Sequence, residues 1–167
     1  GLRKIAEKTT KDFAYKWIYD PRGFRENTWM PHFFKQVNSQ DLESVKRTDQ
    51  EIHAIVSYLF DRSEAFKMEK MQNKGNADNG RMLVNSLGCL GCHATEGEEQ
   101  VALKSVNSMR REHGPNLINL GSKTTQKWIY NWIRDPQGYH SGTKMPNLRL
   151  SKQEASDISA FLIGQRD

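Results

Sequence analysis

The chain has 167 residues, of which 36% are hydrophobic and 27% charged, a composition typical of a globular protein with one domain or two small ones. No stretch approaches the ~18 consecutive apolar residues of a membrane span, and the opening GLRKIAEKTT lacks the apolar core of a signal peptide. The net charge of +5 is spread over both halves without a Lys/Arg cluster among aromatic residues, which argues against nucleic-acid binding and favours acidic protein partners.

The first third of the chain is predicted to be helical. Residues 8–34 contain an aromatic-rich segment, followed by Asp20-Pro21 and the box Thr28-Trp29-Met30-Pro31. Residues 51–59, EIHAIVSYL, have the apolar spacing of an amphipathic helix. Since no part of the chain alternates apolar and polar residues for long enough to indicate a strand, we predict an all-α fold.

Residues 61–79 have the composition of a linker, because they are polar and end in Gly/Asn-rich sequence. Within them, residues 65–71 are expected to extend the preceding helix. Residues 79–87 then show a short helical pattern that leads to the only two cysteines of the chain, in Cys89-Leu90-Gly91-Cys92-His93.

Three chemistries use cysteines at this spacing. A redox disulfide motif follows a strand, whereas residues 79–87 have a helical pattern. A structural zinc site needs four ligands, but the chain has no further cysteine, and His113 and His140 are 27 residues apart. The third chemistry is c-type haem attachment, in which two thiols reach the two vinyl groups of one porphyrin edge and the adjacent histidine ligates the iron. The sequence favours this third interpretation and leaves the first two as minor alternatives.

A haem attached in this way needs a second axial ligand, and methionine raises its reduction potential for electron transfer. The box Thr143-Lys144-Met145-Pro146 places a methionine 52 residues after His93, and Pro146 favours an extended backbone at Met145. A methionine in isolation is more often a loop or core residue, so this assignment rests on the position of Met145 after the haem motif. The intervening residues 94–113 are predicted to be a charged surface loop with one short helix.

The motifs of the second part of the chain occur in a characteristic order: Gly80, the CxxCH motif, His113-Gly114-Pro115-Asn116-Leu117, the aromatic helix 128–133, Asp135-Pro136, the Met145 box and a closing helix 154–163. In this order, residues 75–164 resemble a class I cytochrome c domain. The resemblance implies a class I cytochrome c fold over residues 75–167.

The resemblance also implies the residues of the site. Haem c would be attached covalently through Cys89 and Cys92, with His93 as proximal iron ligand, Met145 as distal ligand and Pro115 as a brace for His93. Trp132 shares a helix face with Trp128, and we expect it to be either a core aromatic or a contact of the haem. His113 and His140 are expected to face solvent.

A repeat relates the two ends of the chain. Residues 8–34 align without a gap to residues 123–149 with 12 of 27 positions identical, and the alignment pairs Asp20 with Asp135 and Met30 with Met145. After an insertion of 12 residues, residues 51–59 match residues 154–162. Residues 1–62 therefore resemble the distal half of a second cytochrome c domain, whose proximal half would lie before Gly1.

This half-domain allows two interpretations. In the first, Met30 ligates a haem attached outside this sequence, on an upstream half-domain or a companion chain that completes residues 1–62. In the second, the half-domain has lost its haem and survives as a docking module. The intact Thr28-Trp29-Met30-Pro31 box favours the first. His32 beside this box could compete as a ligand, but it is expected to be a surface residue. Without the other half, we expect several aromatic residues to be partly exposed: Phe13, Tyr15, Trp17, Phe33 and Phe34.

The sequence thus predicts a half-domain (residues 1–62), a linker (63–74) and a complete cytochrome c domain (75–167). The expected function is electron transfer in a respiratory chain or complex, since a haem with both axial positions filled has no open site for substrate. The alternative is a peroxidase-like enzyme or gas sensor with a displaceable distal ligand. Because haem is attached to cysteines outside the cytoplasm, we expect a periplasmic or extracellular location in a bacterium.

Overall fold

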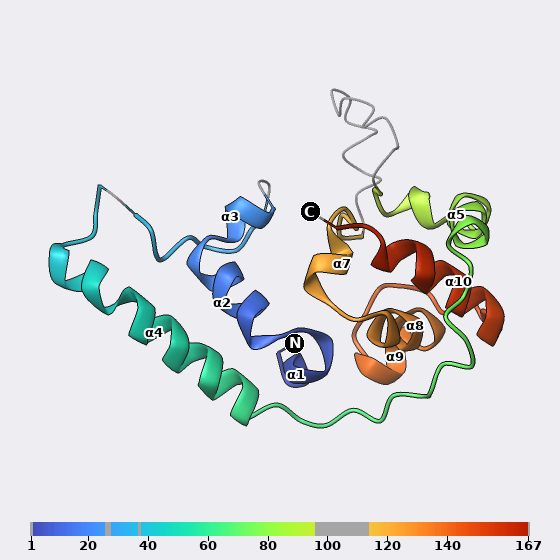
Figure 1. The fold of residues 1–167 in the computed structure, drawn as a ribbon, viewed down its shortest axis with the longest axis horizontal. Coiled ribbons are helices and arrows are strands. Elements are labelled where there is room, and N and C mark those ends of the chain that lie inside the picture. Colours follow the sequence, from blue (N-terminus) through green and yellow to red (C-terminus); the bar gives the residue numbers. More distant parts are fainter. Residues whose placement is uncertain (1, 26–27, 37, 96–113, 167) are drawn as a thin grey trace. The chain divides into compact units, whose positions relative to one another are not determined.

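The computed structural model describes residues 2–25, 28–36, 38–95 and 114–166. Within these residues every regular element is a helix (Figure 1), so the prediction of an all-α fold is confirmed. The contacts between residues divide the chain into two units, Gly1–Phe66 and Lys67–Asp167. Most of the loop predicted over residues 94–113 lies outside the described residues.

The unit Gly1–Phe66 contains the helices α1 (Ile5–Lys8), α2 (Lys11–Tyr19), α3 (Pro21–Phe24) and α4 (Leu42–Asp61). Side-chain caps determine where the helices begin: Thr10 Oγ1 accepts a hydrogen bond from the Phe13 N–H before α2, and Asp20 Oδ1 accepts one from the Gly23 N–H before α3. The long helix α4 packs against α2.

The core of this unit is small. It consists of Ala14, Phe34, Ile52 and Val56, with half-buried neighbours around them. The expectation that Phe34 is partly exposed is wrong: Phe34 is only 8% exposed, because it packs beside Ile52 and Val56 of α4. Phe33 is 66% exposed, and the other three aromatic residues of that prediction are half-buried.

The unit Lys67–Asp167 contains α5 (Ala77–Ser86), the 3-10 turn η1 (Cys89–Gly91), α7 (Leu120–Lys123), α8 (Gln126–Arg134), α9 (Pro136–Tyr139) and α10 (Lys152–Ile163). Helix α10 packs against both α5 and α8 and buries most of its length. Its N-terminus is fixed by a capping box between Ser151 and Glu154. Helix α10 is therefore the central element of this unit.

Helices α5 and α10 approach each other closely at Gly80. A Cβ atom at this position would lie 2.0 Å from the Asp157 carbonyl oxygen and 2.9 Å from Phe161 Cβ. Just before α5, Asn76 N–H donates a hydrogen bond of 2.7 Å to Asp157 Oδ1. The absence of a side chain at Gly80 is thus what allows the two helices to cross at this distance.

The expected helical extension over residues 65–71 is wrong. Helix α4 ends at Asp61, and residues 63–71 form no helix. Instead, Ser63 Oγ accepts a hydrogen bond from the Ala6 N–H, and Glu64 N–H donates one to the Arg3 carbonyl. These bonds attach the chain to the neighbourhood of α1 and take it away from the axis of α4.

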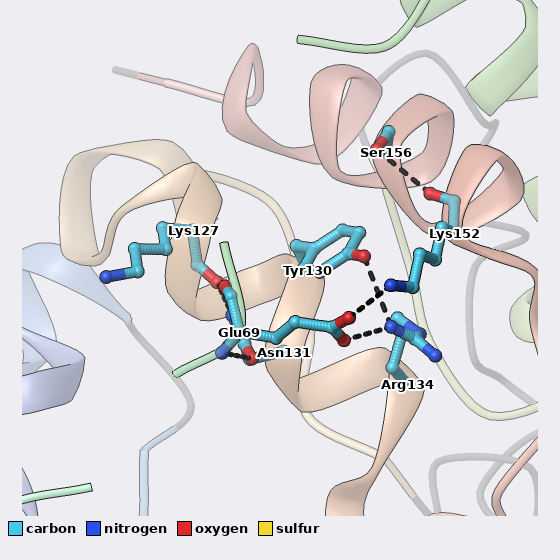
Figure 2. A network of polar contacts seen from close by, with 7 residues as sticks. All are labelled: Glu69, Lys127, Tyr130, Asn131, Arg134, Lys152 and Ser156. Atoms are coloured by element: carbon cyan, nitrogen blue, oxygen red, sulfur yellow. Dashed lines mark hydrogen bonds and ion pairs between the residues drawn. The ribbon is translucent and has the colours of Figure 1, made fainter. Parts of the chain in front are cut away.

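The polar segment that follows belongs to the second unit, and its residue Glu69 forms hydrogen bonds and ion pairs with the helices of that unit (Figure 2). Glu69 N–H donates to Asn131 Oδ1 over 2.7 Å, and Asn131 Nδ2 donates back to the Glu69 carbonyl over 3.1 Å. The Glu69 carboxylate forms ion pairs with Lys152 of α10, at 2.6 Å, and with Arg134 of α8. Hydrogen bonding by Lys152 and the charge of Arg134 lower the pKa of Glu69. Glu69 therefore connects α8 to α10.

The two units contain corresponding helices in the same order along the chain. Helix α2 corresponds to α8 residue for residue at an offset of 115, and α3 corresponds to α9. The caps agree as well: Asp20 has φ −145° and ψ 79°, Asp135 has φ −146° and ψ 77°, and each accepts a hydrogen bond from the glycine three residues later. Helix α4 has 20 residues and α10 has 12, and the difference lies mainly at the N-terminal end of α4.

Candidate haem site

Both cysteines lie on a short turn directly after α5. Gly88 ends the helix region with φ 84°, a left-handed conformation that glycine adopts without strain. The N–H groups of Cys92 and His93 then both donate to the Cys89 carbonyl, at 3.2 and 3.0 Å. These bonds hold Cys89 and Cys92 at the two ends of one short turn.

The two thiols are free and differ in exposure. Cys89 is half-buried and packs against the core of the unit, whereas Cys92 is exposed. Burial, with the neighbouring Cys92 as a lesser cause, raises the pKa of the Cys89 thiol. The element before the motif is the helix α5 and not the strand that a redox disulfide motif would need. The described residues also contain no group of three or more His, Cys, Asp or Glu side chains able to hold a metal ion. Neither minor alternative for the motif gains support.

The imidazole of His93 is oriented by the backbone of Pro115. His93 Nδ1 lies 2.7 Å from the Pro115 carbonyl oxygen. Because a carbonyl oxygen only accepts hydrogen bonds, Nδ1 carries the proton and the Nε2 lone pair is left for a metal. Gly114 makes room for the ring, since a Cβ atom there would lie 2.5 Å from His93 Cε1.

Met145 is fixed on both sides of its backbone. Its N–H donates to Thr143 Oγ1 over 3.2 Å, and its carbonyl accepts from Gln137 Nε2 over 3.0 Å. The Trp132 indole N–H donates to the Met145 sulfur, at 2.9 Å. A thioether sulfur has two lone pairs, so one remains available for a metal while the other accepts the indole proton.

The order of these elements agrees with a known family. The family model for cytochrome c matches residues 77–164, from α5 through α10, and includes Cys89, Cys92, His93 and Met145. The chain belongs to the cytochrome c family. Cytochrome c domains hold haem c covalently and typically carry electrons. No curated protein and no solved structure matches the chain.

The residues of this cytochrome c fit haem c by the chemistry of their donor atoms. They offer two free thiols, one imidazole nitrogen with its tautomer fixed, and one thioether sulfur. Cys89, Trp132 and Met145 all pack against the same hydrophobic core. Thiols that bind the porphyrin and a His/Met pair that binds the iron are the ligand set of electron-carrying cytochromes c.

Several other residues of the sequence prediction have a place in this cytochrome c. Trp132, for which two roles were open, stacks on Trp128 at 5.3 Å and contacts Met145. His140 is exposed, and His113 lies outside the described residues.

Among the described parts of the chain, no helix is both long and apolar enough to cross a membrane.

Met30 belongs to the other unit and has the same backbone contact as Met145. Its N–H donates to Thr28 Oγ1 over 3.2 Å, as that of Met145 does to Thr143. His32 was expected at the surface, but its side chain is only 25% exposed, and Nε2 lies 3.8 Å from Asp20 Oδ1. The structure describes Met30 and the CxxCH motif in separate units and brings no second cysteine pair to Met30.

Three residues position the ligands in ways that the sequence interpretation did not assign: it named Gly114 and Thr143 only as members of their motifs, and it missed Gln137. The spacing Thr-x-Met occurs in both units and was a signal for Thr143, because a Thr side chain readily accepts from the N–H two residues later. Nothing in the local sequence marked Gln137, whose amide reaches Met145 from α9.

Proposed function

We propose that this cytochrome c transfers single electrons through one haem attached to Cys89 and Cys92, with His93 and Met145 as axial ligands. The observation that carries the proposal is the hydrogen bond of 2.7 Å between His93 Nδ1 and the Pro115 carbonyl. It leaves Nε2 as the only ring atom able to bind iron. The bound haem supplies the one-electron couple.

The residues of the chain give this couple its environment. The two thiols would hold the porphyrin covalently, and the Pro115 carbonyl increases the basicity of the imidazole that would bind the iron. The backbone contacts of Met145 with Thr143 and Gln137 hold the thioether in place without help from the metal. A site with both axial positions occupied by protein favours electron transfer over catalysis, so we do not assign an enzymatic reaction.

We extend the proposal to location and partners. Covalent haem attachment takes place outside the cytoplasm, which supports a periplasmic or extracellular role in a bacterial respiratory chain or complex. The net charge of +5 supports association with an acidic redox partner. Such association should weaken as ionic strength rises.

We also propose that residues 1–62, which lie within the unit Gly1–Phe66, are the distal half of a second cytochrome c domain. Its support is the agreement of α2 and α3 with α8 and α9 and the shared Thr-x-Met contact. In this proposal Met30 ligates a haem attached outside this sequence, on an upstream half-domain or a companion chain.

The test compares Met145→Ala with the matched variant Met30→Ala. In the holoprotein, intact mass and the pyridine haemochrome assay should give one covalent haem per chain for both variants. Met145→Ala should lose the methionine–iron charge-transfer band of the oxidised protein and bind carbon monoxide when reduced, because it opens the distal position. In the chain purified without the half-domain that would carry the second haem, Met30→Ala should keep the band and bind no carbon monoxide, because the haem that Met30 would ligate is attached outside this sequence.

Absence of covalent haem from the wild type would contradict the proposal as a whole. Rapid carbon monoxide binding by the reduced wild type would instead support the alternative function, a haem enzyme or gas sensor with a displaceable ligand.

A further inference from the structure

Helices α4 and α10 each have a face that is buried inside their own unit, and the residues of the two faces correspond in the repeat. When Glu51–Leu59 is aligned with Glu154–Leu162, Ile52 corresponds to Ala155 and Val56 to Ser159. Ile52 and Val56 are buried in the core that α4 forms with α2, and Ala155 and Ser159 are fully buried in the other unit. Gln126 at the start of α8 donates to Ser159 Oγ, which confirms the direction of that face.

A second face of α10 receives α5. Asp157 accepts the hydrogen bond from Asn76, and Gly80 lies against the Asp157 carbonyl and Phe161. Ile158 and Phe161 are only 3% and 7% exposed. In addition, Arg81 of α5 lies over the Phe161 ring, 5.4 Å from its centroid.

The corresponding residues of α4 are exposed. Ala54, Ile55 and Tyr58 occupy the positions of Asp157, Ile158 and Phe161, and we call these three residues the α4 face. Ile55 is 41% exposed and Tyr58 is 63% exposed. The described helices of Gly1–Phe66 correspond to α7–α10, and none of them has the place of α5. A face that is buried in one unit is therefore uncovered in the other.

We propose that the α4 face is the docking site for a helix of the α5 type, carried by the proximal half of a second cytochrome c domain. The docking helix has glycine opposite Ala54, as Gly80 lies opposite Asp157. It needs no cation for Tyr58, because Arg62 of the same chain already lies over the Tyr58 ring, 5.9 Å from its centroid. This inference rests on the proposal that Gly1–Phe66 is a distal half-domain.

The α4 face differs in one respect from the face of α10 on which α5 packs. Ala54 has no carboxylate, so the bond that Asp157 accepts from Asn76 has no counterpart. Docking on α4 therefore depends more on apolar burial by Ile55 and Tyr58. A second copy of this chain is a poor occupant, because its α5 is already packed on its own α10, with Gly80 and Val84 buried.

The test uses the full-length holoprotein and a fluorescein-labelled peptide of residues 73–88, NKGNADNGRMLVNSLG, as a surrogate for the docking helix. Fluorescence anisotropy should show saturable binding. Tyr58→Glu in the chain should weaken it at least tenfold. Val45→Glu, at an exposed position of α4 outside the face, should leave it unchanged. A peptide with Gly80→Leu should bind at least tenfold more weakly, since its side chain prevents the close approach.

Three results would overturn the inference: no saturable binding, equal effects of Tyr58→Glu and Val45→Glu, or undiminished binding of the Gly80→Leu peptide. Concentration-dependent dimerisation of the chain that Tyr58→Glu abolishes would also overturn it and assign the face to a second copy. Haem content and reversible reduction are measured first on the same sample. Failure of docking with an intact redox couple then leaves the proposed electron transfer standing.

Discussion

The position of one proton decides what His93 can do. The Pro115 carbonyl accepts a hydrogen bond from Nδ1, so the neutral imidazole presents Nε2 as its only free lone pair. The geometry also requires Gly114, whose N–H donates to the Cys92 carbonyl while its missing side chain makes room for the ring. The ligand is therefore oriented by the polypeptide itself, before any metal is considered.

Replacing Gly114 should disturb this orientation. In Gly114→Ala the new Cβ atom would lie 2.5 Å from His93 Cε1 and 2.8 Å from the Cys92 carbonyl oxygen. We expect the holoprotein to lose about 1–3 kcal/mol of stability, as overpacked sites do, together with part of its low-spin spectrum. Denaturant unfolding followed by haem absorbance measures both. Gly91→Ala is the matched control, because its Cβ atom would meet nothing within 4 Å. Equal effects of the two variants would contradict the argument.

Trp132 should tune the haem through the sulfur of Met145. A hydrogen bond from the indole N–H withdraws electron density from the thioether, which makes it a weaker donor to ferric iron and favours the reduced state. In Trp132→Phe the reduction potential should fall, by no more than about 20–65 mV, which is the one-electron equivalent of the whole hydrogen bond of about 0.5–1.5 kcal/mol. Spectroelectrochemistry measures the shift. Trp17→Phe, the counterpart in the other unit, should leave the potential unchanged, and a higher potential in Trp132→Phe would refute this role.

At the scale of elements, Glu69 joins a segment without secondary structure to two helices. Its backbone pairs with Asn131 of α8, and its carboxylate pairs with Lys152 of α10 and Arg134 of α8 (Figure 2). These partners lower the pKa of Glu69 in the folded protein. A lowered folded pKa stabilises the protein at pH above the ordinary carboxyl range, about 4.3, and this stabilisation disappears as the pH falls through the folded pKa.

The variant Glu69→Gln should therefore be destabilised at neutral pH and resemble the wild type in acid. Thermal unfolding at pH 7 should give a lower Tm for the variant, and the difference should shrink as the pH is lowered toward 3. Glu64→Gln, at an exposed position outside the network, serves as the control and should show no such trend. A difference in Tm that stays constant over this pH range would show that the ion pairs are not its source.

The elements also show how far local sequence predicts this molecule. The CxxCH motif and the Met145 box are local patterns, and each copy of the repeat is a continuous segment; the structure gives each a defined turn or cap. The attachment of Glu69 was not predictable, because its partner Asn131 lies 62 residues away and polar composition alone resembles a linker. The burial of Phe34 was missed for a similar reason, since it depends on where α4 crosses the chain.

At the scale of the whole molecule, the two units should differ in stability. Among the residues that the structure describes, the core of Gly1–Phe66 contains four buried hydrophobic residues, whereas that of Lys67–Asp167 contains ten. Units of about 60 residues are marginal even with a complete core, and the α4 face leaves Ile55 and Tyr58 uncovered. Under the proposed function, covalent attachment of haem would constrain the second unit further, because both cysteines of the chain lie there.

Hydrogen exchange on the full-length holoprotein measures this difference directly. Amides of α2 and α4 should exchange through openings of lower free energy than those of α8 and α10, because opening α2 and α4 exposes less buried apolar surface to water. The comparison has an internal control, since α2 and α8 have equal lengths and equivalent caps. Equal protection of the two pairs would show that burial around α4 does not limit the stability of its unit. Slower exchange of α4 when the peptide of residues 73–88 is added would link this weakness to the uncovered face.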